Sequence, residues 1–155
     1  MPRGWRTNAM ISLHPMVQAG VGLVLFYIGL KWFSGGFKAM GDVAWLQYFT
    51  SNIIYMFVGG IVLTLAWQSS SLSTAAIVGL MGTGLVPLPA GIAFVLGANI
   101  GTTGTIWLAA ALGSNGFPVG DLRHIAVSHT LLNVAMATAA LPFVRPLAAL
   151  IQRIF

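Results

Sequence analysis

No charged side chain occurs between Asp42 and Asp121, a stretch of roughly half of this 155-residue chain. Soluble domains carry about a quarter charged residues, so a stretch of this length without charge cannot form the surface of one. The whole chain is 57% hydrophobic and 6% charged, with a mean hydropathy of +0.90. The sequence therefore predicts an integral membrane protein and excludes enzymes and binding modules that work in free solution.

The few charges are mostly basic. Seven Lys and Arg stand against two Asp and no Glu, which gives a formal net charge of +5. The basic residues are scattered rather than gathered into a stripe, so they indicate helix ends anchored among lipid head groups and argue against a nucleic-acid partner. The chain has no cysteine, which excludes disulfides, thiolate metal sites and thiol catalysis.

Apolar segments divide residues 1–155 into a series of predicted membrane segments. An N-terminal arm over residues 1–16 precedes a first span over 17–40, which is long enough to cross a hydrocarbon core of about 30 Å. Small residues in this span are expected to allow close helix packing. They are Gly20, Gly22, Gly29, Gly35 and Gly36.

The next apolar segment, residues 52–86, is too long for a single crossing. One straight helix over it would measure roughly 50 Å at 1.5 Å per residue, and polar side chains interrupt it from Gln68 to Thr74. We therefore expect a re-entrant helical hairpin whose tip carries the Gln-Ser-Ser-Ser sequence. Irregular backbone at membrane depth is tolerated only where protein or a wet cavity surrounds it.

A second interruption is predicted within residues 88–113, at the sequence Gly-Ala-Asn-Ile-Gly-Thr-Thr of residues 97–103. Two half-helices with a central break form one crossing of the kind found at transporter binding sites. The last span covers residues 121–141 and ends near a proline, and the tail over 142–155 forms either a short interfacial helix or a continuation of the span. The expected fold class is all-α and polytopic.

The polar tip of the hairpin is the most informative feature for function. It places Gln68, Ser69, Ser70 and Ser71 together in a hydrocarbon setting, where each unsatisfied polar group costs several kcal/mol. Free backbone N–H groups at a helix terminus suit an anion, whereas hydroxyl and carbonyl oxygens suit a small hard cation. The alternative is that the serines only bond carbonyls one turn back and ease helix packing.

The second break adds Asn99, Thr102 and Thr103 between glycines that permit a close approach of the backbone to an ion. Two isolated polar breaks would each be costly, so we expect both to line the same cavity. No Lys or Arg lies near either break in sequence. A bound anion would therefore be neutralised by helix dipoles, by co-bound cations or by a residue from another segment, such as Arg123.

The segments TLAWQSSSLSTAAIVGL and GANIGTT resemble the signature segments of the sodium/phosphate cotransporter family. The resemblance extends over about residues 18–141, from GLVLFYIGLKWFSGGFKAM to RHIAVSHTLLN, with Asn52 where the hairpin begins. Two positions depart from the family pattern, since Ile53 replaces a proline and Leu72 replaces a small or hydroxyl residue. Family members carry the motif set twice, as inverted repeats, whereas this sequence holds one copy. The resemblance therefore implies that residues 1–155 form a single transmembrane transporter repeat.

The resemblance implies sodium-coupled transport of inorganic phosphate across a cell membrane, expected to be the inner membrane of a bacterium or archaeon. It implies no cofactor besides the co-transported sodium ions, and no transition metal. The phosphate-binding residues that it implies are Gln68, Ser69, Ser70, Ser71 and Asn99. The sodium-binding residues that it implies are Thr64, Gln68, Ser71, Thr74, Asn99, Thr102 and Thr103.

With one motif set in the chain, two copies are expected to build the site together. The predicted crossings add up to an odd number, which places the two ends on opposite sides of the bilayer. The basic residues of the two sides balance, so the positive-inside rule favours neither orientation, and we expect an antiparallel dual-topology homodimer. One side carries Arg3, Arg6 and Arg123, and the other carries Lys38, Arg145 and Arg153.

Other functions make specific demands on the same residues. A membrane serine hydrolase would use one of the tip serines with His129 as base, but the Gly-x-Ser-x-Gly elbow is absent. A lipid-phosphate phosphatase would need an intramembrane acid. The sequence therefore favours neither the hydrolase nor the phosphatase. Two alternatives stay open: a half-transporter or assembly subunit that needs a different partner chain, and a proton-coupled oxyanion carrier using His129, which could instead only bond Asn133.

Overall fold

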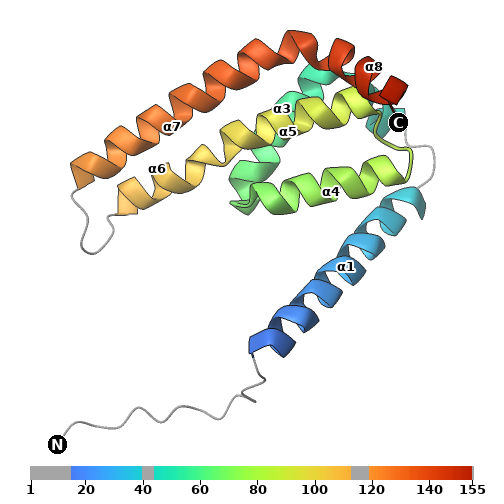
Figure 1. Cartoon of the computed structure of the whole chain (residues 1–155), viewed down its shortest axis with the longest axis horizontal. Coiled ribbons are helices and arrows are strands. Elements are labelled where there is room, and N and C mark those ends of the chain that lie inside the picture. Colours follow the sequence, from blue (N-terminus) through green and yellow to red (C-terminus); the bar gives the residue numbers. More distant parts are fainter. Residues whose placement is uncertain (1–14, 40–43, 113–118, 155) are drawn as a thin grey trace, which may run out of the picture.

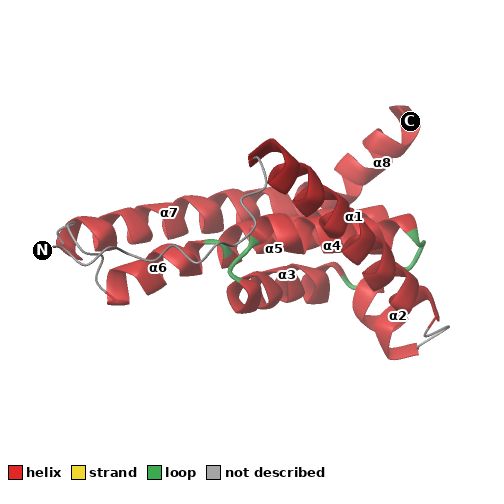
Figure 2. Ribbon diagram, turned by 90° about the horizontal axis from the view of Figure 1, so that it is seen from below, coloured by secondary structure: helices red, strands yellow, loops and turns green. Residues whose placement is uncertain are grey.

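The computed structural model describes residues 15–39, 44–112 and 119–154, and every regular element within them is a helix (Figure 1, Figure 2). Residues 1–14 of the expected N-terminal arm lie outside the described part, as do residue 40 of the first span and residue 113 of the broken helix. Among the described helices, three apolar stretches are long enough to cross a membrane. These are Pro15–Ala39, Leu88–Leu112 and Gly120–Ile154, and they confirm the expected all-α class of a polytopic membrane protein.

The helices follow one another with short connections. In chain order they are α1 (Pro15–Ala39), α2 (Ala44–Ser51), α3 (Ile53–Trp67), α4 (Ser70–Gly82), α5 (Leu88–Gly101), α6 (Thr103–Leu112), α7 (Val119–Ala140), the 3₁₀ turn η1 (Leu141–Phe143) and α8 (Val144–Ile154).

The helix pair α3 and α5 forms the centre of the fold, because the two backbones touch. A Cβ atom added to Gly60 would lie 2.0 Å from the carbonyl oxygen of Phe94. A Cβ atom added to Gly97 would lie 1.9 Å from the carbonyl oxygen of Phe57. Only glycine fits at these two positions, as in other membrane helix pairs that pack through small residues. Figure 2 shows α3 lying alongside α5 as a result.

The helix α4 packs against both α5 and α1. The contact with α1 again depends on a glycine, since a Cβ atom on Gly79 would lie 2.5 Å from the hydroxyl oxygen of Ser34. An apolar core fills the space between α3, α4 and α5 and the loop that joins the last two. Its buried members are Met56, Ile77, Val86, Ala90 and Phe94.

The start of α3 is fixed by Asn52. Its side-chain oxygen accepts hydrogen bonds from the backbone N–H groups of Ile54, at 2.8 Å, and Tyr55, at 3.3 Å. This is the usual way in which an N-cap side chain satisfies N–H groups of the first helical turn. Ile53 then occupies the first helical position, where proline is common because the N–H needs no acceptor and the fixed φ of proline suits a helix. The departure from the family pattern at this residue is therefore compatible with the helix.

The interruption between α5 and α6 contains fewer residues than the segment 97–103 in which the sequence placed it. Only Thr102 separates the two helices, and it keeps right-handed helical angles with φ −60° and ψ −24°. Its N–H still donates to the carbonyl oxygen of Ala98 at 2.9 Å. The interruption falls within the expected residues 97–103 and is confined to Thr102, because Gly97 and Gly101 pack against α3 as part of a regular helix.

The helices α6 and α7 run side by side (Figure 1). The indole N–H of Trp107 donates to the hydroxyl of Thr130 at 2.9 Å and links the two helices. Beyond α7, the turn η1 contains Pro142 and leads into α8. Val144 and Ala148 of α8 are buried and Arg145 and Arg153 are exposed, so α8 packs against α5 on one side only.

The first half of α1 has few neighbours within the chain. Figure 1 shows it projecting from the other helices, and Leu23 and Tyr27 are 70% and 65% exposed. The glycines of α1 were expected to serve close packing. A Cβ atom on any of them would meet nothing within 4 Å in the described residues. Within the described residues of one chain, the close helix contacts use glycines of α3, α4, α5 and α6 instead, and packing of the α1 glycines against a second chain stays a prediction.

Candidate functional site

The polar turn between α3 and α4 has an unusual backbone at its first residue. Gln68 has φ 52° and ψ 28°, and it is the one non-glycine residue with positive φ among the described residues. Its backbone N–H donates to the carbonyl oxygen of Thr64 at 2.8 Å, which closes α3. Its side-chain amide donates to the carbonyl oxygen of Leu65. Gln68 thus ends α3 in the left-handed conformation that glycine usually supplies.

Ser69 begins α4 as its N-cap. Its hydroxyl oxygen accepts the N–H of Leu72 at 3.2 Å, and its carbonyl oxygen accepts the N–H of Ser73 at 3.1 Å. Ser70 and Ser71 lie in the first turn of α4, where backbone N–H groups have no acceptor within the helix. Ser70 is half-buried and Ser71 is exposed. The turn therefore combines hydroxyl groups with the positive end of a helix dipole.

A buried hydrogen-bond chain supports this turn from within. The hydroxyl of Thr64 on α3 donates to the hydroxyl oxygen of Ser73 on α4 at 2.8 Å, and both residues have no exposed surface. The hydroxyl of Ser73 donates in turn to the carbonyl oxygen of Ser69 at 3.0 Å. These bonds hold the two helices together directly below the turn.

Ser73 was missing from the site residues that the sequence implied. The signal for it was present, because a serine four positions after an N-cap lies one turn along the same face of the helix. Its bond to the carbonyl of Ser69 matches the reading in which serines bond one turn back. That reading does not cover Ser69, whose hydroxyl caps α4 instead.

At the α5–α6 junction, Gly101 and Gly104 pack against residues at the end of α3 and in the α3–α4 turn. A Cβ atom on Gly101 would lie 2.8 Å from the Cβ atom of Thr64. A Cβ atom on Gly104 would lie 3.6 Å from the amide nitrogen of Gln68 and 2.4 Å from a methyl carbon of Leu65. The structure therefore brings the α5–α6 junction and the α3–α4 turn together, by way of glycine backbone.

The polar side chains of the second segment lie differently. Asn99 is exposed, and it follows Gly97 by two residues, about 200° around the helix from the face that contacts α3. The hydroxyl of Thr103 is engaged with the carbonyl oxygen of Ile100 at 2.8 Å. Thr102 and Thr74 are half-buried. The structure of one chain thus brings Thr64 and Gln68 to the glycines of α5 and α6, and it does not bring Asn99 to the turn.

His129 belongs to a different part of the fold. It lies on α7 in an open groove beside α6, together with Ile106 and Ser128. Its Nδ1 atom is buried and has no hydrogen-bond partner within the described residues. The side chain of Asn133 donates to the backbone carbonyl of His129 at 2.8 Å, so the expected pairing between the two residues involves the backbone of His129.

The buried bond between Thr64 and Ser73 gives a first prediction. Thr64→Val is expected to lower the free energy of unfolding by about 1 kcal/mol, because it removes one buried hydroxyl donor and keeps most of the volume. Reversible unfolding in mixed detergent micelles measures the change. Thr105→Val, at an exposed position of α6, is the matched control and should change stability little. Equal stability of both variants would contradict the role given to this bond.

Comparison with known proteins finds one family and several curated relatives to which the chain is similar. The sequence model of the Na+/Pi-cotransporter family matches residues 25–151. The human sodium-dependent phosphate transport protein 2C is 44% identical over 78 residues, which are 50% of this chain and 13% of that protein. Protein 2A of Rattus norvegicus is 35% identical over 95 residues, 58% of this chain and 15% of that protein. No solved structure matches the chain significantly.

The human sodium-dependent phosphate transport protein 2B is 30% identical over 106 residues, which are 60% of this chain and again 15% of that protein. The chain therefore spans only about a seventh of the length of these curated relatives. The similarity is to one part of each relative.

Proposed function

The chain belongs to the Na+/Pi-cotransporter family, whose sequence model matches residues 25–151, and we propose that it carries inorganic phosphate across a membrane together with sodium. The family and the curated relatives are transporters rather than enzymes. The single observation that carries the proposal is the polar α3–α4 turn, which lies against glycine backbone of α5 and α6 in an otherwise apolar bundle.

The phosphate would lie at the beginning of α4. The N–H groups and hydroxyls of Ser69, Ser70 and Ser71 and the amide of Gln68 can donate hydrogen bonds to its oxygens, and the helix dipole favours its negative charge. No charged side chain occurs from residue 43 to 120, so these donors are neutral. Co-bound cations would then help to balance the charge of the anion, which favours sodium coupling at this kind of site.

The sodium ions would be held by neutral oxygen atoms, the ligands that hard cations prefer. The proposed ligands on the turn side include Thr64, whose hydroxyl donates to Ser73 and keeps its oxygen lone pairs for a cation. Ligands of the second segment include Asn99. The full proposed set is Thr64, Gln68, Ser71, Thr74, Asn99, Thr102 and Thr103.

We propose that two copies of this repeat complete the site as an antiparallel dual-topology homodimer. Asn99 is exposed and lies about 200° from the α3 contact face, so it is available to a second copy. The first half of α1 also presents a large apolar surface, and a Cβ atom added to its Gly20 or Gly22 would meet nothing within 4 Å among the described residues. The assembly subunit with a different partner chain is the alternative, and it would use the same surfaces.

Uptake by the purified chain tests the proposed transport. Proteoliposomes should accumulate radioactive phosphate when external sodium is present and should not when choline replaces it. Ser70→Ala should lower the initial rate at least tenfold, because it removes a donor from the first turn of α4. Ser128→Ala, at an exposed position of α7, should leave the rate unchanged. Uptake that ignores the change from sodium to choline would refute the proposal.

The dual topology has a separate test, because the chain contains no cysteine. A single cysteine introduced by Gln152→Cys, exposed on α8, reports the side on which that helix lies. We expect about half of the molecules to react with a membrane-impermeant maleimide from each side of the membrane. Labelling of active protein from one side alone would rule out the antiparallel pair and leave the parallel pair or a different partner.

A proton-coupled carrier is the second candidate, and it is favoured by the buried Nδ1 atom of His129, which has no hydrogen-bond partner in the part of the chain that the structure describes. The same proteoliposomes decide between the two ions. Phosphate uptake driven by a pH gradient in choline, and lost in His129→Gln, would support proton coupling. Uptake driven by sodium at equal pH on both sides would support the sodium-coupled proposal.

A further inference from the structure

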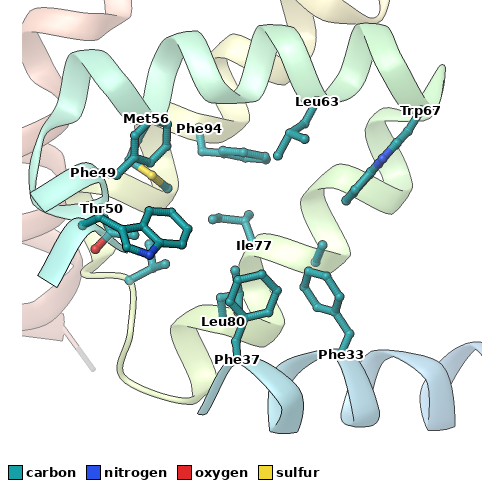
Figure 3. Close-up of a pocket in the computed structure, with 13 residues that line it drawn as sticks. Phe33, Phe37, Phe49, Thr50, Met56, Leu63, Trp67, Ile77, Leu80 and Phe94 are labelled. Carbon is teal, nitrogen blue, oxygen red and sulfur yellow. The ribbon is translucent and has the colours of Figure 1, made fainter. Parts of the chain in front are cut away.

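An apolar cavity of about 240 Å³ lies among the first five helices (Figure 3). Phe33 and Phe37 of α1 close it on one side, and Ile77 of α4 and Phe94 of α5 line its interior. Leu63 of α3 lines the opposite wall (Figure 3). The cavity is separate from the hydroxyl groups of the α3–α4 turn, and none of the residues assigned above to phosphate or sodium lines it.

The lining of this cavity is apolar apart from one hydroxyl and the indole N–H groups of Trp45 and Trp67. Its one hydroxyl belongs to Thr50, and that hydroxyl donates to the carbonyl oxygen of Gln47 at 3.4 Å. Water needs two or more polar partners, and an apolar engineered cavity of about 150 Å³ is known to stay dry and to bind benzene. A larger cavity with this lining is therefore suited to an apolar guest.

The cavity is elongated and open to the outer surface. It follows α3 from Met56 to Trp67, eleven residues or about 16 Å at the rise of an α-helix. A second apolar cavity of about 350 Å³ shares Phe33, Trp67 and Ala76 with it and extends the path along α1. Leu63 and Trp67 are both 39% exposed, so the cavity communicates with the surface that hydrocarbon covers in a membrane protein.

One end of the cavity has the composition of a membrane interface. Trp45 lines this end and is 60% exposed, and Tyr48 and Tyr55 stand nearby with their hydroxyl oxygens 3.5 Å apart. Exposed Trp and Tyr are typical of the level of lipid head groups. The other end reaches Trp67, directly before Gln68.

We propose that this cavity is a binding site for one acyl chain of a membrane phospholipid. The head group lies beside α2, and the tail follows α3 towards the α3–α4 turn. Shape, lining and opening all fit a long flexible hydrocarbon, and the bilayer supplies it at high concentration. Because the tail ends against Trp67, the bound lipid supports the end of α3 from which the candidate site begins. The assignment of the lipid does not depend on the transported substrate.

Photolabelling tests this site. The chain is reconstituted with phosphatidylcholine that carries a diazirine near the end of one acyl chain, and labelled peptides are located by mass spectrometry. We expect the label on cavity residues of α1, α3 and α4. Ala76→Phe fills the cavity and should lower this labelling at least fivefold. Val78→Phe, two residues away and 57% exposed, adds the same ring to the outer surface and should not lower it.

Leu63→Trp narrows the mouth of the cavity at a partly exposed position and should give the same loss if Ala76→Phe does not fold. Label spread over the outer helix faces and equal in all variants would overturn the proposal. So would a disulfide between two copies of Leu63→Cys with no label in the cavity, because a second chain would then occupy it. Loss of phosphate uptake alone does not bear on the lipid.

Discussion

Replacing Gly97 by alanine is expected to separate α3 from α5 and to cost about 3 kcal/mol or more of unfolding free energy. The added Cβ atom would lie 1.9 Å from the carbonyl oxygen of Phe57 and 3.1 Å from the backbone nitrogen of Ile61. Both neighbours are backbone atoms of a regular helix, so no side chain can rotate away to make room. The whole of α3 must move, and with it the hydrogen bond from Thr64 to Ser73.

Thermal unfolding of the purified protein in detergent measures this effect, with the monodisperse fraction in size-exclusion chromatography as a second reading. Gly82→Ala is the matched control, because a Cβ atom there meets nothing within 4 Å and the residue is exposed at the end of α4. That variant should be as stable as the wild type or slightly more stable, since alanine favours a helix over glycine. Equal melting of the Gly97 and Gly82 variants would show that the two helices do not touch as described.

The glycines show what the sequence could and could not predict. Apolar length and the scarcity of charge were sufficient for the all-α membrane class, because those properties depend on composition and not on contacts. Which glycines lie at a helix contact depends on the partner helix, and the sequence of one helix does not reveal it. The glycines of α1 were therefore assigned to packing, whereas Gly60, Gly79 and Gly97 make the close contacts.

The site was predictable to a similar degree. The polar turn could be located from the sequence because several hydroxyl groups in an apolar segment are costly without partners. The left-handed backbone of Gln68 could not be anticipated, because glutamine has no special preference for that conformation. Nor could the placement of Asn99, which depends on the α5–α6 junction being one residue wide instead of unwound.

Gln68→Gly is expected to abolish sodium-dependent phosphate uptake, with a loss of at least tenfold, while the protein becomes more stable. The residue has φ 52° and ψ 28°, a conformation that costs non-glycine residues roughly 1–2 kcal/mol and costs glycine almost nothing. Glycine would therefore keep the turn, relieve the strain by about 1 kcal/mol and remove only the side-chain amide. Uptake in proteoliposomes and thermal unfolding in detergent measure the two effects on the same preparation.

Because uptake is expected to fall while stability rises, the experiment separates the loss of a binding group from damage to the fold. Gln68→Asn keeps an amide and tolerates the left-handed conformation, so it should fold and retain more uptake than the glycine variant. A loss of uptake that accompanied a loss of stability would indicate only a damaged turn. Normal uptake in Gln68→Gly would mean that Gln68 serves the backbone alone, and phosphate would then have to be bound by the hydroxyl and N–H groups of Ser69, Ser70 and Ser71. A stable variant without transport would instead identify the amide as a group that contacts the transported ions, which explains why a strained residue ends α3 where glycine would be the easier choice.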